Sequence, residues 1–165
     1  MAEWSEKQRT SCFFTGHRAI DDADRVAVKK GVAEAIDRKT ADGIRDFVCG
    51  GALGFDTIAA LAVLEKKKSN PTVRLILYLP CPEQHHGWSA DDRSRYEDIK
   101  RRADEVVYTS EFYFKGCMQL RDRRMAETSA HCICYYTRGG TGTAYTVKYA
   151  RELGVDIEEI TIPKA

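Results

Sequence analysis

A glycine-rich turn between two apolar segments constrains this sequence more than any other feature. Residues 44–49 are mostly apolar and strand-like, residues 50–54 read Gly-Gly-Ala-Leu-Gly, and residues 57–64 are small and apolar, as in a helix. Glycine lets the backbone turn sharply and approach another group closely. A helix that begins at such a turn directs unpaired amide groups and the positive end of its dipole towards the turn. The segment therefore predicts a strand, a turn and a helix, with a site for an anion such as phosphate at the turn.

A second stretch repeats this design later in the chain. Residues 131–136 are apolar and strand-like, residues 138–143 read Arg-Gly-Gly-Thr-Gly-Thr, and residues 144–153 have helical character. Because parallel strands bring their carboxyl ends to one edge of a sheet, we expect the two turns to lie on the same edge. The sequence thus predicts two opposite walls of one nucleotide-type cleft.

The remaining segments also alternate between strands and helices. Strands are predicted at residues 11–15, 44–49, 73–79, 105–109, 131–136 and 155–162, and helices from a cap at 21–22 to about 39 and at about 55–68, 94–103, 118–129 and 144–153. This alternation predicts an α/β fold, a Rossmann-like three-layer sandwich with a mostly parallel sheet. The length predicts a single domain over residues 1–165, in which the polar residues 1–10 form a flexible N-terminal tail.

Composition argues against some classes of function. The 26 basic and 25 acidic residues give a formal net charge of +1, so we expect nucleic acid to be an unlikely partner. No apolar run approaches the roughly 20 residues that a spanning helix needs, so we expect a cytoplasmic protein with no membrane partner. The six cysteines lie mostly in or beside strand-like runs, and we expect reduced, buried thiols rather than a metal site.

Polar side chains beside the turns are the candidate ligand contacts. His17 and Arg18 follow the first strand, where they either cap the next helix or contact a ligand, and Arg18 is the better phosphate partner. Asp56 lies two residues after Gly54. It either complements the helix dipole or accepts hydrogen bonds from ribose hydroxyls, and the two roles are compatible.

The connection after the third strand has two histidines and a tryptophan, His85, His86 and Trp88. Loops at the ligand edge often contribute to function. The sequence leaves open whether the histidines take part in catalysis or bind a metal, whether Trp88 belongs to a lid that stacks on a base, or whether neither holds.

Four motifs in a fixed order resemble the SLOG superfamily, which includes the DprA and LOG proteins. They are Thr-Gly-His-Arg at 15–18, Gly-Gly-Ala-Leu-Gly-Phe-Asp at 50–56, the arginines within 121–124, and Gly-Gly-Thr at 139–141. The chain is most similar to the small YpsA/YoqJ-like branch. The resemblance implies a Rossmann-like domain that binds a nucleotide or nucleotide-derived ligand. It also makes a homo-oligomer possible, because related proteins often pair.

The resemblance assigns residues to the predicted site. Both glycine turns and the late arginine match motif positions, and in LOG-type members the second turn faces a ribose phosphate. With the contacts inferred above, the predicted ligand-binding residues are Gly16, His17, Arg18, Gly50, Gly51, Gly54, Asp56, Arg121, Gly139, Gly140, Thr141, Gly142 and Thr143. No cofactor or metal is implied.

The sequence departs from the LOG pattern where catalysis would occur. Arg138 replaces a proline, and Tyr145-Thr146 stand where LOG hydrolases have glutamates. The remaining candidates for a catalytic carboxylate are Asp56, Asp122 and Glu127. We therefore expect a nucleotide sensor or binding module, with a LOG-like N-glycosidic phosphoribohydrolase of nucleoside monophosphates as the alternative. DprA-like binding of single-stranded DNA is the second alternative.

Overall fold

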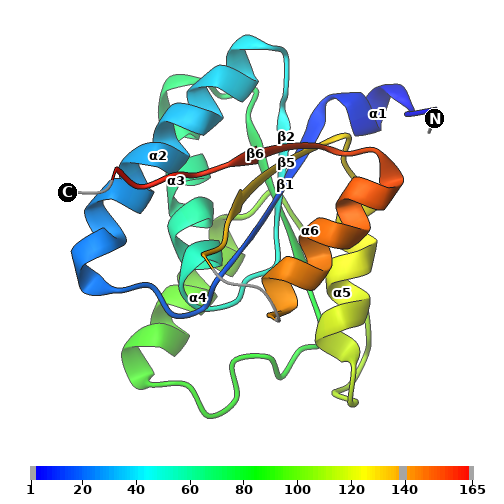
Figure 1. Ribbon diagram of the computed structural model, residues 1–165. Coiled ribbons are helices and arrows are strands. Elements are labelled where there is room, and N and C mark those ends of the chain that lie inside the picture. Colours follow the sequence, from blue (N-terminus) through cyan, green and yellow to red (C-terminus); the bar gives the residue numbers. More distant parts are fainter. Residues whose placement is uncertain (1–2, 138–140, 164–165) are drawn as a thin grey trace.

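The computed structural model describes residues 3–137 and 141–163, and its centre is a six-stranded, entirely parallel sheet (Figure 1). The strands lie in the order β4-β3-β2-β1-β5-β6. Their bounds are β1 Ser11–Gly16, β2 Asp46–Cys49, β3 Arg74–Leu79, β4 Glu105–Tyr108, β5 His131–Tyr135 and β6 Asp156–Glu159. The predicted α/β architecture is confirmed, and all six strands fall within the predicted segments to within one residue.

Helices cover both faces of this sheet (Figure 1). Helices α2, α3 and α4 pack on one face, and α5 and α6 pack on the other. The helix bounds are α1 Glu6–Arg9, α2 Asp22–Ala41, α3 Phe55–Ser69, α4 Ala90–Arg102, α5 Cys117–Ala126 and α6 Gly142–Leu153. Right-handed crossovers explain why the helices divide between the two faces. From β1 to β4 each new strand is added on one side, and β5 and β6 are added on the other side of β1, so the connecting helices of the two groups lie on opposite faces.

The central strand β1 shows why its apolar run is nearly continuous. Phe13 packs on the α5–α6 face with Met125 and Val147, whereas Phe14 points to the opposite face. There the Phe14 ring stacks against Phe47, with centroids 5.9 Å apart. Successive strand residues point to opposite faces, so a strand covered on both sides has apolar residues throughout.

The structure places a helical turn in the segment for which we expected a flexible tail. In α1, the Ser5 side chain accepts a hydrogen bond from the Gln8 amide, and the Gln8 side chain accepts one from the Ser5 amide. Gln8 also contacts residues far away in the sequence. Its side-chain Nε2 donates to the Glu127 carbonyl at 3.0 Å, and its backbone carbonyl accepts a hydrogen bond from the Ala130 amide at 2.8 Å. These contacts hold residues 5–9 against the end of α5.

The order of the strands fixes where a ligand is expected to bind. After β4, the chain returns to pair β5 with the free side of β1, so the sheet reverses its direction of growth between these two strands. In open α/β sheets the crevice for ligands lies at such a reversal, beyond the carboxyl ends of the strands. The carboxyl ends of β1 and β5 therefore flank the predicted ligand position.

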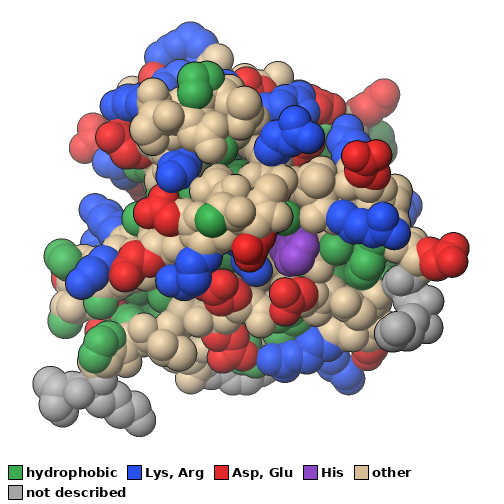
Figure 2. Space-filling view, turned by 90° about the horizontal axis from the view of Figure 1, so that it is seen from above, with side chains coloured by type: hydrophobic (Ala, Val, Ile, Leu, Met, Phe, Trp, Pro, Cys, Tyr) green, Lys and Arg blue, Asp and Glu red, His purple; other side chains and the backbone are tan. Residues whose placement is uncertain are grey.

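The opposite, amino-terminal edge of the sheet has a mixed surface. Figure 2 shows basic and acidic side chains interspersed over this edge. All six cysteines are buried, as predicted, and none forms a disulfide in this structure. Within residues 3–137 and 141–163, no helix combines the length and apolar character that a bilayer-spanning segment needs.

Candidate functional site

A cleft of about 360 Å³ opens at the reversal point between β1 and β5. Three segments provide most of its walls: the loop after β1, the first turns of α5 and the start of α6. Its lining residues are Thr15, Gly16, His17, Arg18, Ala19, Ala52, Asp56, Gln84, Met118, Gln119, Arg121, Asp122, Met125, Thr141, Gly142 and Thr143. Eight of the predicted ligand-binding residues belong to this set.

The lining, rather than the volume, distinguishes this cleft. A groove between α2 and α3 measures about 550 Å³ but is lined by outward-facing helix residues such as Glu65 and Lys66. The cleft at the reversal point instead combines Arg18 and Arg121 with hydroxyl groups and the start of a helix. Ligand sites usually place a few convergent polar groups in a concave surface, which is the arrangement found here.

His17 connects three segments of the cleft. Its backbone amide donates to the Tyr135 carbonyl at 3.3 Å, and its carbonyl accepts from the Phe55 amide at 3.0 Å. Its side-chain Nε2 accepts a hydrogen bond from the Thr137 amide at 2.8 Å. The residue is only 4% exposed. His17 thus ties the end of β1 to the start of α3 and to the loop after β5, while the neighbouring Arg18 is exposed and lines the cleft.

The glycines of the first turn make room for protein rather than for a ligand. A Cβ atom on Gly50 would lie 2.7 Å from Nη1 of Arg121, and one on Gly54 would lie 2.1 Å from the Arg18 carbonyl oxygen. Gly51 and Gly54 have φ angles of +71° and +77°, which disfavour other residues. Gly50, Gly51 and Gly54 are absent from the lining of the cleft, so the predicted close approach exists but its partner is the protein's own chain.

Arg121 occupies the space above Gly50. Its Nη1 donates to the Gly50 carbonyl and more weakly to the Tyr78 carbonyl, and its Nε donates to the Asp122 carboxylate at 2.7 Å. Arg121 as a residue is 5% exposed and still lines the cleft. Arg121 therefore connects α5 to the carboxyl ends of β2 and β3. Asp122 is its ion-pair partner, as expected for an aspartate next to a buried arginine.

Asp56 is a buried carboxylate at the start of α3. It accepts a hydrogen bond from the Ala52 amide at 3.1 Å and is 7% exposed. Burial raises the pKa of Asp56 to about 6, although Arg121, the Ala52 amide and Arg18 act in the opposite direction. The start of α3 already has a carboxylate of its own, because the Asp56 side chain accepts a hydrogen bond from the Ala52 amide in the glycine turn.

The second turn differs because hydroxyl groups surround the helix start. Thr141 caps α6, and its Oγ1 accepts from the Ala144 amide at 3.1 Å. Gly142 and Thr143 follow in the first turn, and all three residues line the cleft. Gly139 and Gly140, predicted for the same turn, lie outside the described residues. The first turn of α6 thus faces the cleft with two hydroxyl-bearing residues and no carboxylate.

Residues that the prediction missed complete the walls. Gln84 is buried, with Nε2 3.4 Å from the Gly50 carbonyl and Oε1 3.5 Å from Nη1 of Arg121. Met118 and Gln119 line the cleft from the first turn of α5. The only sequence signal for Gln84 is its position after a strand end. Glu127, one of the candidate catalytic carboxylates, is not part of the cleft lining and accepts a hydrogen bond from Tyr149 at 2.6 Å.

The connection after β3 is packed against α4. The His85 ring stacks on Tyr96 with centroids 4.5 Å apart, and the Trp88 ring meets Tyr96 edge-on at 5.4 Å. His85 Nε2 also lies 3.0 Å from a Glu97 carboxylate oxygen. Among the described residues, no three His, Cys, Asp or Glu side chains come together as metal ligands. These contacts give His85 and Trp88 a packing role.

Two solved structures share this fold. DNA processing protein A (DprA) from Streptococcus pneumoniae aligns with a TM-score of 0.66 at 19% identity, covering 95% of this chain and 51% of the DprA chain. DprA from Helicobacter pylori aligns with a TM-score of 0.63 at 16% identity, covering 92% of this chain and 65% of that chain. The chain thus spans about half to two thirds of these larger proteins.

The H. pylori structure corrects one expectation. It is described in terms of its mode of single-stranded DNA binding. Our expectation that nucleic acid is an unlikely partner is therefore wrong, because it rested on the net charge of +1 alone. Proteins of this fold include a binder of single-stranded DNA, so the overall charge of the chain does not exclude such a partner.

Sequence relatives lead to the family. A prophage-derived protein of Bacillus subtilis, YoqJ, is 30% identical over 118 residues, which is 64% of this chain and 69% of YoqJ. A UPF0398 protein of Bacillus thuringiensis is 29% identical over 130 residues, or 77% of this chain and 71% of that protein. A family model, YpsA, described as the YspA SLOG family, matches residues 12–161. The chain therefore belongs to the YpsA family of SLOG proteins.

Proposed function

We propose that the cleft binds the phosphate of a nucleotide or nucleotide-derived ligand and that the chain acts as a binding module or sensor. The observation that supports this most is the convergence of Arg18 and the first turn of α6 at the reversal point of the sheet. A helix start offers amide donors and a partial positive charge, and an arginine adds a full charge with paired donors. Both are groups that recognise phosphate.

Within the cleft, we propose that the phosphate lies beside α6 rather than α3. The α3 start holds the Asp56 carboxylate, which repels a second anion when ionised. Arg18 has no ion-pair partner among residues 3–137 and 141–163, so its charge is available to a ligand. The Thr141–Thr143 turn and Arg18 therefore form the proposed phosphate subsite.

A binding role fits the carboxylates better than hydrolysis. Glycosidic hydrolysis needs a carboxylate that can activate water or stabilise a cationic sugar. Asp122 forms an ion pair with Arg121 at 2.7 Å. Asp56 accepts a hydrogen bond from the Ala52 amide and interacts electrostatically with the same guanidinium. Both groups thus already have cationic or amide partners, which favours binding without turnover.

Single-stranded DNA is the second candidate ligand. DprA from H. pylori, which shares this fold, binds single-stranded DNA. A DNA strand presents phosphate groups like those of a nucleotide. The proposed subsite recognises the phosphate and does not by itself distinguish a free nucleotide from one within a strand.

Isothermal titration calorimetry tests the proposal. The panel is nucleoside mono- and diphosphates, cyclic nucleotides, NAD and ADP-ribose, each up to millimolar concentration. We expect at least one to bind, and Arg18→Ala to weaken that binding by about tenfold or more, since a charge-assisted hydrogen bond is lost. Arg25→Ala is the matched control, because Arg25 is an exposed arginine outside the cleft lining. Absence of binding across the panel, or equal losses in both variants, would refute the proposal.

A further inference from the structure

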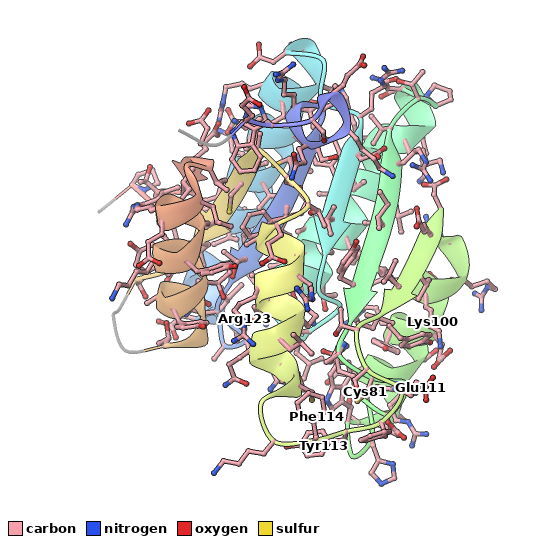
Figure 3. All side chains as sticks on the ribbon, turned by 90° about the vertical axis from the view of Figure 1, so that its right-hand side faces the viewer. Cys81, Lys100, Glu111, Tyr113, Phe114 and Arg123 are labelled. Carbon is pink, nitrogen blue, oxygen red and sulfur yellow. The ribbon has the colours of Figure 1, made fainter. Side chains whose placement is uncertain are left out.

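Three consecutive aromatic residues project from the ligand edge of the sheet. Phe112 and Tyr113 are 64% and 65% exposed, and Phe114 is 38% exposed. They lie in the loop between β4 and α5, and Figure 3 shows Tyr113 and Phe114 below the start of α5, at the carboxyl edge of the sheet. Contiguous exposed apolar side chains on a folded protein generally mark an interaction site.

The loop has a defined local structure. The Ser110 hydroxyl donates to the Phe112 carbonyl at 2.7 Å and accepts from the Phe112 amide at 3.3 Å. At the other end, the Cys117 amide donates to the Phe114 carbonyl at 3.0 Å. The rings are therefore presented from a backbone that is held on both sides, which lowers the entropy lost when a partner binds.

This loop leads directly into the cleft. Met118, which lines the cleft, follows Phe114 by four residues, so the two Cα atoms are at most about 14 Å apart. A ligand that extends out of the cleft along the first turn of α5 meets the aromatic loop next. Glu111 and Lys115 flank the three aromatic residues in the sequence and are both exposed, and the Lys115 ammonium offers a contact for a phosphate.

The chemistry of the loop indicates its partner. Residues 110–116 contain three aromatic side chains and no aliphatic one. Exposed flat rings are the usual means of holding unpaired bases, because every base has a π-face that can stack on them. We propose that Phe112–Phe114 forms a base-stacking platform for single-stranded nucleic acid whose phosphate lies in the cleft.

The platform extends the proposed function and rests on it, since it makes a strand rather than a lone nucleotide the preferred ligand. The stacking of one base on an aromatic ring corresponds to roughly 5- to 150-fold in affinity. We expect a ten-residue oligothymidylate to bind at least about tenfold more tightly than thymidine monophosphate. If two bases of the oligonucleotide stack on the loop, each should increase its affinity relative to that of thymidine monophosphate.

Fluorescence anisotropy with labelled oligothymidylate, and calorimetry with thymidine monophosphate, test the platform on the full chain. The double variant Phe112→Ala/Tyr113→Ala removes the two most exposed of the three rings, and Phe112→Leu/Tyr113→Leu keeps apolar side chains at these positions without rings. We expect both to lose at least about tenfold in affinity for the oligonucleotide and to leave monophosphate binding unchanged. Arg18→Ala weakens both ligands, which identifies the cleft as their shared site.

The outcomes separate the two proposals. If the monophosphate binds but the alanine double variant keeps full affinity for the oligonucleotide, the platform is refuted and the proposed function stands. If no mononucleotide binds while oligonucleotide binding depends on the rings, the free-nucleotide function fails and the platform stands. If the wild type dimerises in sedimentation equilibrium, the alanine variant is monomeric and oligonucleotide affinity is unchanged, the loop is a protein interface and the inference is wrong.

Discussion

Replacing Asp56 by asparagine should make the protein more stable at neutral pH. Burial raises the pKa of this carboxyl to about 6 from an ordinary value of 3.8, so the folded protein binds the proton more tightly than the unfolded chain does. Raising the pH from 4 to 7 therefore favours the unfolded state through this group. A difference of about 2 pH units corresponds to about 3 kcal/mol. Asparagine keeps a side-chain oxygen that can accept the hydrogen bond from the Ala52 amide, and it removes the negative charge.

The expected gain depends on pH in a defined way. Above pH 6 the Asp56→Asn variant should exceed the wild type in free energy of unfolding by up to about 3 kcal/mol. Below about pH 4 the wild-type carboxyl is protonated in both states, and the difference should vanish. Urea unfolding followed by circular dichroism between pH 4 and 8 measures this difference directly.

Asp104 provides a control with the opposite sign. Burial raises the pKa of Asp104, but hydrogen bonds from Lys67 and the Leu75 amide outweigh burial and hold it below its usual range. Asp104→Asn should therefore destabilise the protein at pH 7, and this loss should shrink as the pH falls through the range where the carboxyl titrates. An Asp56→Asn variant no more stable than the wild type at pH 8, or one whose difference is constant with pH, would refute the reasoning.

Further substitutions test the other contacts of the site. Arg121→Met should lower the free energy of unfolding, measured in urea, by about 3–5 kcal/mol, because it leaves the buried Asp56, the partly buried Asp122 and the Gly50 carbonyl without their cation. Gly54→Ala should lower the free energy of unfolding by more than about 2 kcal/mol, because φ is +77° and the new Cβ would lie 2.1 Å from the Arg18 carbonyl oxygen. Gly142→Ala is the control in the same assay: its Cβ would have no atom within 4 Å, so its effect on stability should be near zero. Trp88→Ala should cost about 2 kcal/mol through lost packing on Tyr96 without changing nucleotide affinity in calorimetry; a selective loss of affinity would instead support a lid.

The fold followed from the sequence because each strand and helix has a strong local pattern. The strand at 73–79 is almost continuously apolar, which indicates a central strand covered on both faces, and β3 lies there. The helix α1 was missed because four residues form no stable helix alone. Its capping box from Ser5 to Gln8 was readable, but the contacts of Gln8 with Glu127 and Ala130 join residues about 120 positions apart.

The position of the cleft was also predictable, while the contacts of the first glycine turn were not. The motifs at 15–18 and 141–143 line one cleft, as expected from their places after parallel strands. A glycine in the sequence indicates that something approaches the backbone closely, but not what approaches. At Gly50 the approaching group is Arg121, which lies 71 residues further along the chain and arrives by tertiary packing.

The two turns, similar in sequence, therefore have complementary electrostatic roles. At α3 the chain supplies its own anion, Asp56, and balances it with the buried Arg121. At α6 it supplies the Thr141 cap and no carboxylate in the first turn, while Arg18 stands unpaired among the described residues on the wall opposite. We therefore expect a negative group in the cleft to be repelled from the first turn and attracted to the second, which would favour one orientation for a ligand with a single phosphate. If the cleft binds phosphate as proposed, the same asymmetry predicts that phosphate affinity rises in the Asp56→Asn variant at neutral pH, where the ligand keeps its charge.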